Sequence, residues 1–329
     1  MGPLSNDVAL DVRGLTTTFR TDAGPLRAVD GVDFSLRRGQ ITAVVGESGC
    51  GKSVTALSIM RLLPPSASTA GDVLLGGTVA LHACSAAAMR RHRGKDLAMV
   101  FQDAQTSLNP VLTIGQQLSE AITVHEAVSS RMAVARVITM LERVGVPEPE
   151  LRLRAYPHEL SGGLKQRAMI AMSLLCRPAV LIADEPTTAL DVTIQAQILD
   201  LIKELRDDPS LQMAIMFITH DMGVVADIAQ DVIVMYAGRI VERGSVDTVL
   251  RNPKHPYTRA LLKSIPVLGE RRQKLEVIGG QPPNLHRLPP GCAFGPRCAS
   301  VTDACRAAMP ALRTVAPEHD IRCILEVNP

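Results

Sequence analysis

One stretch of the sequence combines glycines, a lysine and a serine at the spacing that binds phosphate. Residues 46–53 read Gly-Glu-Ser-Gly-Cys-Gly-Lys-Ser and match the pattern G-x-x-x-x-G-K-[ST]. The glycines let the backbone wrap a phosphate with its N–H groups pointing inward, and the N-terminus of a following helix adds positive charge. Lys52 is expected to reach the β- and γ-phosphates of a nucleotide, and Ser53 to bind Mg²⁺. The pattern alone does not separate a kinase, a GTPase and a transport ATPase.

Two adjacent carboxylates follow a short apolar run at residues 180–183. An apolar strand of a parallel sheet would deliver both carboxylates beside the phosphate loop. Asp184 then suits the coordination shell of Mg²⁺, and Glu185 suits a general base that takes a proton from the attacking water. The alternative is a buried strand that ends in two solvated acids. The presence of the phosphate loop favours the catalytic interpretation.

Four of the seven cysteines lie near the C-terminus, at Cys292, Cys298, Cys305 and Cys323. Their spacing, C-x5-C-x6-C-x17-C, lacks the C-x2-C pairs of common zinc ribbons. In a reducing compartment such clustering suggests metal ligation rather than disulfides. Four thiolates can hold either a tetrahedral Zn²⁺ or a 4Fe–4S cluster, and a tail without metal is the third alternative.

A separate hypothesis concerns the reactivity of Cys50, because this residue lies inside the phosphate loop beside a predicted helix N-terminus. A helix N-terminus lowers the pKa of a thiol. Alkylation of Cys50 is then expected to block nucleotide binding, and the nucleotide is expected to protect the thiol. The alternative is a small side chain that only fills the loop.

The elements that must position these residues alternate between strands and helices. Short apolar or alternating runs predict strands at residues 32–37, 41–45, 180–183 and 214–219. A helix is expected from about Lys52 to Leu63, ended by Pro64 and Pro65. Residues 231–242 predict a hairpin that turns at Ala237 and Gly238. This alternation predicts an α/β core with a parallel sheet.

The organisation of the chain follows from its length and from two changes in pattern. A chain of 329 residues exceeds the size at which one core stops growing. Residues of about 86–178, including 114–124 and 131–144, are mostly helical in pattern and predict a helical insert between two sheet-forming halves. After about residue 265 the composition shifts, since prolines and glycines punctuate residues 279–295 and the helical periodicity fades. We therefore expect a main domain at residues 1–265 and a small, loop-rich appendage at residues 266–329.

Charge and hydropathy limit the class of protein. The formal net charge is only +2, so no global field favours nucleic acid. No run approaches the 18 apolar residues of a spanning helix, and residues 1–7 lack the pattern of a signal peptide. We expect a soluble, cytoplasmic chain that reaches a membrane only through a partner.

The tetrapeptide Leu160-Ser161-Gly162-Gly163 is specific enough to point to one protein family. It resembles the signature motif of ABC ATPases, and it lies between the phosphate loop and the paired carboxylates, as expected for that family. Four further residues resemble conserved parts of the same family: the Q-loop glutamine at Gln102, the D-loop aspartate at Asp191, the switch histidine at His220, and the adenine-stacking aromatic at Phe19.

This resemblance implies a fold and a set of roles. The fold is a P-loop NTPase core of the RecA type with an antiparallel β subdomain, a helical insert and the cysteine appendage. The implied catalytic residues are Glu185, His220 and Gln102, and the implied Mg²⁺ ligands are Ser53, Gln102 and Asp184. The implied ATP contacts are Phe19, Gly46, Ser48, Gly49, Cys50, Gly51, Lys52, Ser53 and Val54.

In this family two ATPase subunits close head to tail around two nucleotides. The resemblance implies that Ser161, Gly162 and Gly163 contact the ATP held by the partner, again through a helix N-terminus that faces an anion. The chain departs from the general signature at Leu164, where glutamine is usual. Peptide-permease ATPases commonly have an apolar residue there, so this departure does not imply inactivity.

Several longer strings resemble dipeptide and oligopeptide permeases, in particular residues 101–110, 183–193 and 255–258. They are more similar to the D-type ATPase than to its F-type partner. The resemblance implies a second, F-type ATPase, two membrane permease subunits, an extracytoplasmic peptide-binding protein, and a peripheral position on the cytoplasmic face of the inner membrane. Residues 106–120 would receive the coupling helix of a permease. The alternatives are a motor for nickel or another solute, a soluble ABC ATPase outside transport, and an ATP-binding partner without turnover.

The appendage resembles the C-terminal region of the same permease ATPases, at Pro290-Gly291-Cys292, Pro296-Arg297-Cys298 and residues 319–323. That resemblance implies a 4Fe–4S cluster held by the four tail cysteines. Its expected role is structural, because a loop-rich tail of this size is too small to build its own core.

Overall fold

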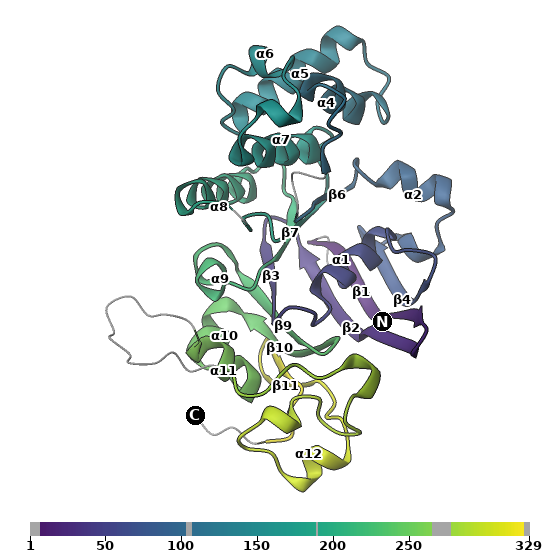
Figure 1. The fold of residues 1–329 in the computed structure, drawn as a ribbon, viewed down its shortest axis with the longest axis vertical. Coiled ribbons are helices and arrows are strands. Elements are labelled where there is room, and N and C mark those ends of the chain that lie inside the picture. The colour runs from purple at the N-terminus through teal and green to yellow at the C-terminus, as the bar shows by residue number, and fades with distance from the viewer. Residues whose placement is uncertain (1–6, 103–106, 189, 265–277, 326–329) are drawn as a thin grey trace. The chain divides into compact units, whose positions relative to one another are not determined.

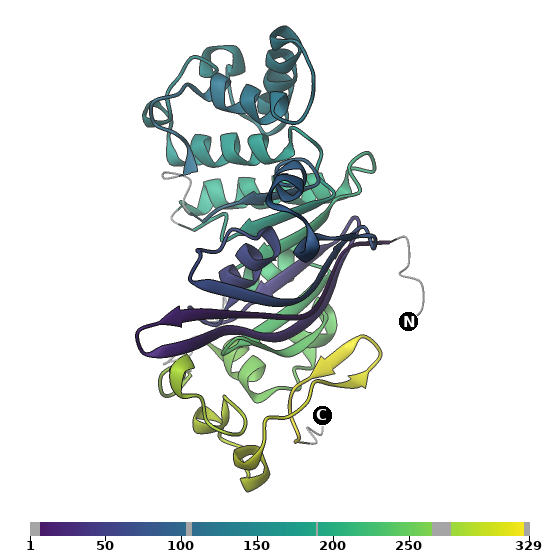
Figure 2. The same cartoon turned by 90° about the vertical axis from the view of Figure 1, so that its right-hand side faces the viewer.

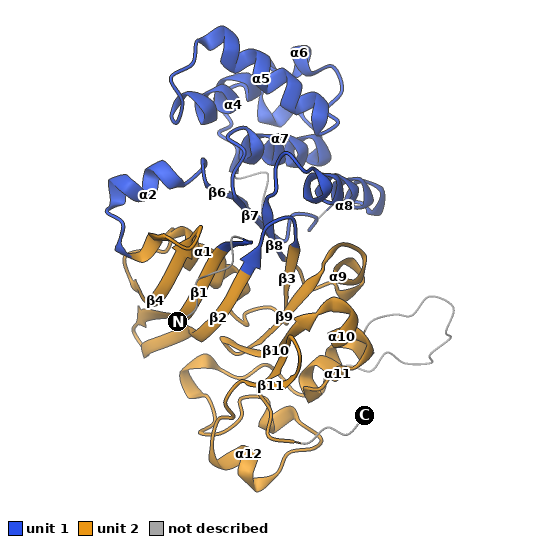
Figure 3. Cartoon of the chain, turned by 180° about the vertical axis from the view of Figure 1, so that it is seen from behind, with its two compact units in different colours: residues 1–9, 36–40, 83–217 blue, residues 10–35, 41–82, 218–329 orange. Residues whose placement is uncertain are grey.

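The computed structural model describes residues 7–102, 107–188, 190–264 and 278–325. The chain divides into two compact units, which Figure 3 shows in different colours. Unit 1 comprises residues 1–9, 36–40 and 83–217, and unit 2 comprises residues 10–35, 41–82 and 218–329. Each unit is therefore assembled from segments that are distant in the sequence. The predicted domain boundary at residues 265 and 266 lies outside the described residues.

Unit 2 contains most of an antiparallel sheet. Its strands lie in the order β2-β1-β4-β5, with bounds β1 (Val8–Thr21), β2 (Gly24–Arg37), β4 (Ala67–Leu75) and β5 (Val79–Ala80). The long strands β1 and β2 are the purple ribbons of Figure 2. β1 pairs with β4 from Leu10 opposite Leu75 to Phe19 opposite Ala67. The strand predicted at residues 32–37 is the last part of β2.

A second set of strands in unit 2 lies in the order β3-β9-β10-β12-β11. Their bounds are β3 (Ile41–Val45), β9 (Asp231–Tyr236), β10 (Arg239–Ser245), β11 (Arg313–Ala316) and β12 (His319–Ile321). β3 and β9 are parallel, whereas β9 and β10 form an antiparallel hairpin. The hairpin turns at Ala237 and Gly238, whose φ angles are 47° and 79°. Positive φ at both central residues is the geometry of a type I′ turn, so the predicted hairpin and its turn are confirmed.

The helices of unit 2 are short. Among the described residues they are α1 (Lys52–Met60), α9 (Met222–Ile228), α10 (Val246–Arg251), α11 (Pro256–Lys263) and α12 (Asp303–Ala307). They are accompanied by the 3₁₀ turns η1 (Leu81–Ala83), η3 (Leu285–Arg287) and η4 (Gly295–Arg297). Helix α1 ends before the predicted stop at Pro64, because Arg61 adopts a left-handed conformation with φ 51°. The N–H of Arg61 bonds to carbonyl groups of the last turn and closes the helix there.

The described part of the C-terminal tail contains regular secondary structure, whereas the sequence predicted an appendage made mostly of loops. Its hairpin β11–β12 joins the sheet through antiparallel pairing of β12 with β10 (Figure 2, yellow). Phe294 of the tail is buried in one apolar cluster with Tyr236 of β9 and Tyr257 of α11. The tail therefore shares a core with strand β9 and helix α11 of unit 2. The sequence did not predict this hairpin, because strands of three or four residues are too short to show a period.

Unit 1 contains three neighbouring strands in the order β8-β7-β6, with bounds β6 (Leu97–Val100), β7 (Val180–Asp184) and β8 (Ala214–Ile218). β6 and β7 are parallel. Every residue of β7 and β8 is buried, which explains their nearly continuous apolar sequence. β6 lies inside the range 86–178, where the sequence predicted mostly helix. Its four residues are too few to distinguish from a buried helical turn.

In the described part of unit 1 the helices are α2 (Ala86–His92), α4 (Ile114–Thr123), α5 (Ser130–Arg143), α6 (Pro149–Arg152), α7 (Gly162–Leu174) and α8 (Val192–Asp207), with the 3₁₀ turn η2 (Pro157–Glu159). Helix α4 begins with a capping box, in which Thr113 and Gln116 satisfy each other's backbone N–H groups. Ile114, Leu118 and Ile122 then lie one turn apart and are fully buried. Helices α4, α5 and α7 pack against one another (Figure 1).

Among the helices that the structure describes, none combines the length and the apolar character that crossing a bilayer requires.

Candidate active site

The phosphate loop connects strand β3 to helix α1 in unit 2, which is the predicted strand–loop–helix context. Two of its glycines are required by close backbone contacts. A Cβ on Gly46 would lie 2.3 Å from the carbonyl oxygen of Met235, and a Cβ on Gly51 would lie 2.7 Å from that of Ala28. Both glycines also have positive φ, at 150° and 108°. The glycines therefore allow the loop to lie directly against neighbouring backbone.

Lys52 is the first residue of helix α1, and its side chain folds back into the loop. Its Nζ donates hydrogen bonds to the carbonyl oxygens of Gly46, at 2.8 Å, and Glu47, at 3.2 Å. The side chain is buried. The ammonium thus lies where it can exchange two carbonyl partners for phosphate oxygens. Ser53 and Val54 follow in the first turn of the same helix.

Cys50 is buried in the loop, with its sulfur 4.0 Å from the Lys52 Nζ. Burial raises the pKa of the Cys50 thiol and outweighs the nearby ammonium. The predicted lowering of this pKa by the helix N-terminus is therefore wrong. The structure agrees with the alternative of a small side chain that fills the loop.

Phe19 and His220 belong to the same unit as the phosphate loop. Phe19 is a half-buried residue of β1, and the nearby Thr17 hydroxyl lies 2.7 Å from that of Ser58 on α1. His220 is exposed just before α9, whose N-terminus is capped by Asp221. Ser48 and Gly49, the remaining predicted contacts in the loop, are exposed.

The paired carboxylates lie in unit 1, at the carboxyl end of β7. Asp184 is buried as the last strand residue. Glu185 follows with φ 45°, a conformation that is uncommon for a residue with a side chain and that occurs often at functional sites. Its carboxylate accepts hydrogen bonds from the Gln102 amide, at 3.2 Å, and from the Thr188 hydroxyl, at 2.9 Å. The structure thus brings together the predicted base and the predicted Q-loop residue.

The signature motif lies at the N-terminus of helix α7 in unit 1. Ser161 is the N-cap, and its hydroxyl accepts a hydrogen bond from the N–H of Leu164. Ser161 and Gly162 are exposed, so the helix end is accessible to an anion. Gly163 is buried against helix α8, where an added Cβ would lie 2.8 Å from the Cγ2 of Ile194.

The D-loop aspartate is positioned next to this contact. The Asp191 carboxylate accepts a hydrogen bond from the N–H of Ile194, at 2.9 Å, and so caps helix α8. Ile194 therefore connects the two motifs, since its backbone binds Asp191 and its side chain packs on Gly163. The structure places the signature motif and Asp191 on two helix N-termini in contact.

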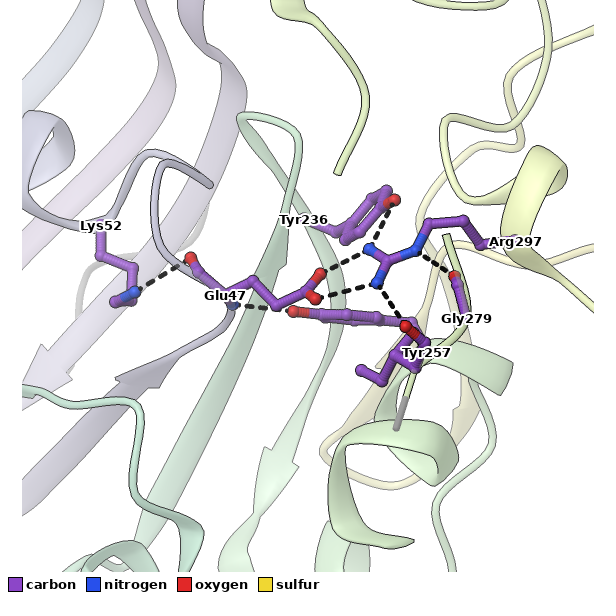
Figure 4. A network of polar contacts seen from close by, with 7 residues as sticks. Glu47, Lys52, Tyr236, Tyr257, Gly279 and Arg297 are labelled. Atoms are coloured by element: carbon purple, nitrogen blue, oxygen red, sulfur yellow. Dashed lines mark hydrogen bonds and ion pairs between the residues drawn. The ribbon is translucent and has the colours of Figure 1, made fainter. Parts of the chain in front are cut away.

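A contact that the sequence did not predict holds the phosphate loop from the side. The Glu47 carboxylate forms an ion pair with Arg297 of the tail, and the Glu47 N–H donates to the Tyr257 hydroxyl at 2.8 Å (Figure 4). Arg297 and Tyr257 both lay in strings that resembled peptide permeases. Nothing in those strings pointed to Glu47, because the three residues are far apart in the sequence.

Comparisons with known proteins show which family the chain resembles. The family model described as ABC transporter matches residues 29–188, and the model described as oligopeptide/dipeptide transporter, C-terminal region, matches residues 241–305. A putative peptide import ATP-binding protein of Brucella ovis is 54% identical over 333 residues, which cover 98% of each chain. The dipeptide transport ATP-binding protein DppD of Bacillus subtilis is 47% identical and covers 96% of this chain and 94% of its own.

The chain belongs to the family of ABC transporter ATP-binding proteins.

Solved ABC structures share the fold of this ABC ATPase. The dimeric structure of MJ0796, a bacterial ABC transporter cassette, matches with a TM-score of 0.64 and 25% identity, over 72% of this chain and 98% of that one. CbiO1 from Clostridium perfringens, part of the transporter complex cbiONQ, matches with a TM-score of 0.62 and 29% identity, over 75% and 92%. The predicted fold class is therefore confirmed.

The tail cysteines of this ABC ATPase lie around one pocket. Cys292, Cys298, Cys305 and Cys323 all line it, and it is partly open to solvent. Burial raises the pKa of the Cys292, Cys298 and Cys323 thiols. Within the described part of the chain, no three His, Cys, Asp or Glu side chains are grouped closely enough to hold a metal ion.

Proposed function

We propose that this ABC ATPase is the motor subunit of a peptide importer, in which ATP hydrolysis drives transport. The observation that carries the proposal is the likeness to a putative peptide import ATP-binding protein over 98% of both chains. The match of residues 241–305 to the oligopeptide/dipeptide transporter C-terminal region supports the same substrate class. Nickel or another solute is the alternative cargo, and an ABC ATPase outside transport is the least favoured reading.

Each unit supplies its own part of the chemistry. In unit 2 the phosphate loop and Lys52 bind the nucleotide phosphates, Phe19 stacks on the adenine, and His220 orients the γ-phosphate. In unit 1 Glu185 removes a proton from the attacking water, and the Gln102 amide that donates to its carboxylate holds it in place.

The predicted Mg²⁺ ligands have the chemistry that this ion prefers. Ser53, Gln102 and Asp184 offer a hydroxyl, an amide oxygen and a carboxylate, and hard oxygen ligands of this kind suit Mg²⁺. The ion neutralises charge on the phosphoryl group when it is bound. These three roles stay predictions.

We propose that the nucleotide sites are shared with a second ATPase of the F type. The exposed N-cap Ser161 and Gly162 are suited to bind an anion from outside the chain. The related cassette MJ0796 has been solved as a dimer, which supports a paired arrangement here. A preparation of this chain alone is then expected to hydrolyse ATP poorly.

The proposed complex also contains two permease subunits and an extracytoplasmic peptide-binding protein, with the ATPase at the cytoplasmic face of the membrane. The region predicted to receive the permease starts at Thr106, which lies outside the described residues. Within its described part, Val111 is 75% exposed. This side chain is therefore accessible to a partner.

We propose further that the four tail cysteines hold a 4Fe–4S cluster that stabilises the tail. Among the described residues the thiols are not grouped closely enough to hold a metal ion as they stand, so the cysteines would have to move together around the cluster. The support for the proposal is that all four line one pocket and that an all-thiolate donor set is used by both zinc and iron–sulfur clusters. Protein purified without oxygen is expected to be brown, to absorb visible light at about 400 nm, and to contain iron and sulfide. Zinc without iron, or colourless protein without either metal, would refute the cluster.

The transport function is tested by reconstituting the chain with its permeases and F-type partner in lipid vesicles. We expect the peptide-loaded binding protein to stimulate ATP hydrolysis, while the unloaded binding protein and Ni²⁺ do not. Stimulation by Ni²⁺ and none by peptides would contradict peptide import and support the alternative cargo.

A further inference from the structure

Arg297 of the tail directly contacts the phosphate loop of the same unit. Its two terminal nitrogens donate to the two carboxylate oxygens of Glu47, at 2.6 Å and 2.9 Å (Figure 4). This is the two-pronged arrangement in which a guanidinium binds a carboxylate most strongly. The Arg297 side chain is only 5% exposed and that of Glu47 is 24% exposed. The pair is thus largely shielded from water and from screening by salt.

The rest of the guanidinium is fixed as well. Arg297 donates to the carbonyl oxygens of Gly279, at 2.9 Å, and Ile278, at 3.3 Å, and to the Tyr236 hydroxyl at 3.3 Å. With the two bonds to Glu47, these contacts use all five N–H groups of an arginine. The guanidinium also lies over the Tyr236 ring, 5.9 Å from its centre. These other contacts therefore hold the Arg297 guanidinium in the orientation in which it binds Glu47.

Tyr257 holds the backbone of the same loop residue. Its hydroxyl accepts the Glu47 N–H at 2.8 Å, and its ring is fully buried against Tyr236 and Phe294, with centroids 4.6 Å and 5.4 Å away. Phe294 comes from the tail, one residue before the turn that carries Arg297. The tail therefore supports Glu47 both directly, through Arg297, and indirectly, through the packing of Tyr257.

Glu47 is in turn connected to the lysine of the phosphate loop. Its carbonyl oxygen accepts a hydrogen bond from the Lys52 Nζ at 3.2 Å. In Figure 4 the Glu47 side chain extends away from Lys52 and toward Arg297. The carboxylate is thus held on the side of the loop opposite the ammonium. An unpaired carboxylate on the second residue of this loop would repel the triphosphate that the loop must bind.

We propose that Arg297 and Tyr257 are positioning residues for ATP, which hold Glu47 so that its carboxylate is neutralised and kept out of the phosphate site. The cysteine-bearing tail is then part of the nucleotide site through these contacts. The proposal rests on ATP binding by the phosphate loop. It is independent of the transported solute, so failure of peptide import would leave it standing.

The test compares ATP affinity among variants of the purified full-length chain. Arg297→Gln removes the ion pair, and Arg306→Gln is the matched control. Arg306 also belongs to the tail and follows a cysteine as Arg297 precedes one, but its ion pair is with the exposed Asp303. We expect Arg297→Gln to weaken binding of a fluorescent ATP analogue about tenfold, since a shielded charge pair is lost, and Arg306→Gln to leave it unchanged.

The double variant Glu47→Gln with Arg297→Gln tests whether Arg297 acts through Glu47. Because no unpaired carboxylate remains, we expect its affinity to return to within about threefold of the wild-type value. An Arg297→Gln protein that binds ATP as well as the Arg306→Gln control would overturn the proposal. So would a double variant that binds as weakly as Arg297→Gln.

Two further measurements separate positioning from general stability. Tyr257→Phe keeps the packed ring and removes only the hydroxyl, so we expect about threefold weaker ATP binding, while the unfolding midpoint falls by only about 2–4 °C through loss of one hydrogen bond. In the assembled complex we expect Arg297→Gln to raise KM for ATP while kcat stays within about twofold, because the contact shapes the loop before the reaction begins. Unchanged affinity in Tyr257→Phe, or a fall in kcat at constant KM, would contradict the assigned role.

Discussion

The carboxylate of Glu47 and the guanidinium of Arg297 are 250 positions apart in the sequence, yet they form a two-pronged ion pair at 2.6 and 2.9 Å. Glu47 is the second residue of the phosphate loop, and Arg297 lies next to Cys298 in the cysteine tail. The pair places the tail in direct contact with the loop of unit 2. Perturbations of the tail are therefore expected to change nucleotide binding as well as stability.

Phe294 is the side chain through which the tail enters the core of unit 2. It is 3% exposed and contacts the rings of Tyr236, Tyr257 and His255. We expect Phe294→Ala to lower the free energy of unfolding by about 3–5 kcal/mol, measured by urea denaturation. Leu151→Ala, at a site 57% exposed, is the control and should change it by less than about 0.5 kcal/mol. Equal effects of the two substitutions would show that the tail does not share this core.

A substitution at Gly163 tests the contact between helix α7, which begins at the signature motif, and helix α8, which Asp191 caps. Alanine there would place a Cβ 2.8 Å from Ile194, whereas alanine at the adjacent Gly162 has its nearest neighbour, on Leu190, at 3.9 Å. We expect Gly163→Ala to destabilise the protein by about 1–3 kcal/mol through overpacking. Gly162→Ala is the matched control and should be neutral or slightly stabilising, because alanine is the better helix former. The measurement is the thermal unfolding midpoint of both variants. An unchanged midpoint in Gly163→Ala would refute the close contact with Ile194.

Part of the pH dependence of the free energy of unfolding is expected to come from His255. Burial lowers its pKa from 6.5 to about 3, while its Nδ1 accepts the N–H of Tyr257. The imidazole is neutral in the folded chain, whereas the unfolded chain takes up a proton below about pH 6.5, so stability is lost as the pH falls through that value. Between about pH 7.5 and 5.5 this loss is roughly 1.4 kcal/mol.

The measurement is the free energy of unfolding at both pH values for the wild type and for His255→Asn, since asparagine keeps a helix cap without titrating. We expect the variant to lose the stated part of the pH dependence. His286→Asn replaces an exposed histidine of the tail and should retain it. A pH dependence that is the same in His255→Asn and in the wild type would contradict a buried neutral imidazole.

Cys50 is expected to react slowly with alkylating reagents, because the reactive form is the thiolate and burial raises the pKa of this thiol. In native protein at neutral pH, mass spectrometry should show at least about tenfold slower labelling of Cys50 than of the half-buried Cys84. Labelling of both cysteines at the same rate would restore the hypothesis of a reactive thiol in the loop.

The sequence predicted those features whose signal is local. The strand Ile41–Val45, the phosphate loop and the Ala237–Gly238 turn depend on neighbouring residues, and each appears where it was expected. The resemblance to ABC ATPases also pointed to Gln102 and Glu185 as catalytic residues, and a hydrogen bond joins the two side chains in the structure.

Features that depend on distant contacts were not predicted. The four residues of β6 show no period, and only their pairing with β7 identifies them as a strand. The pairing of β12 with β10 and the contact of Arg297 with Glu47 join segments that are far apart in the sequence. The pKa of Cys50 depends on the atoms that cover it, because burial outweighs the Lys52 ammonium and the nearby backbone N–H groups, which lower it.

The central claim is that hydrolysis of ATP at Glu185 drives peptide import, and Glu185→Gln tests it most directly. The measurement is ATP-dependent uptake of a labelled dipeptide into vesicles that contain the complete transporter, together with ATP binding and hydrolysis by the same preparation. We expect the variant to bind ATP normally, to hydrolyse it about 10²–10⁴-fold more slowly, as for loss of a general base, and to show background uptake. Wild-type uptake by Glu185→Gln would contradict the account.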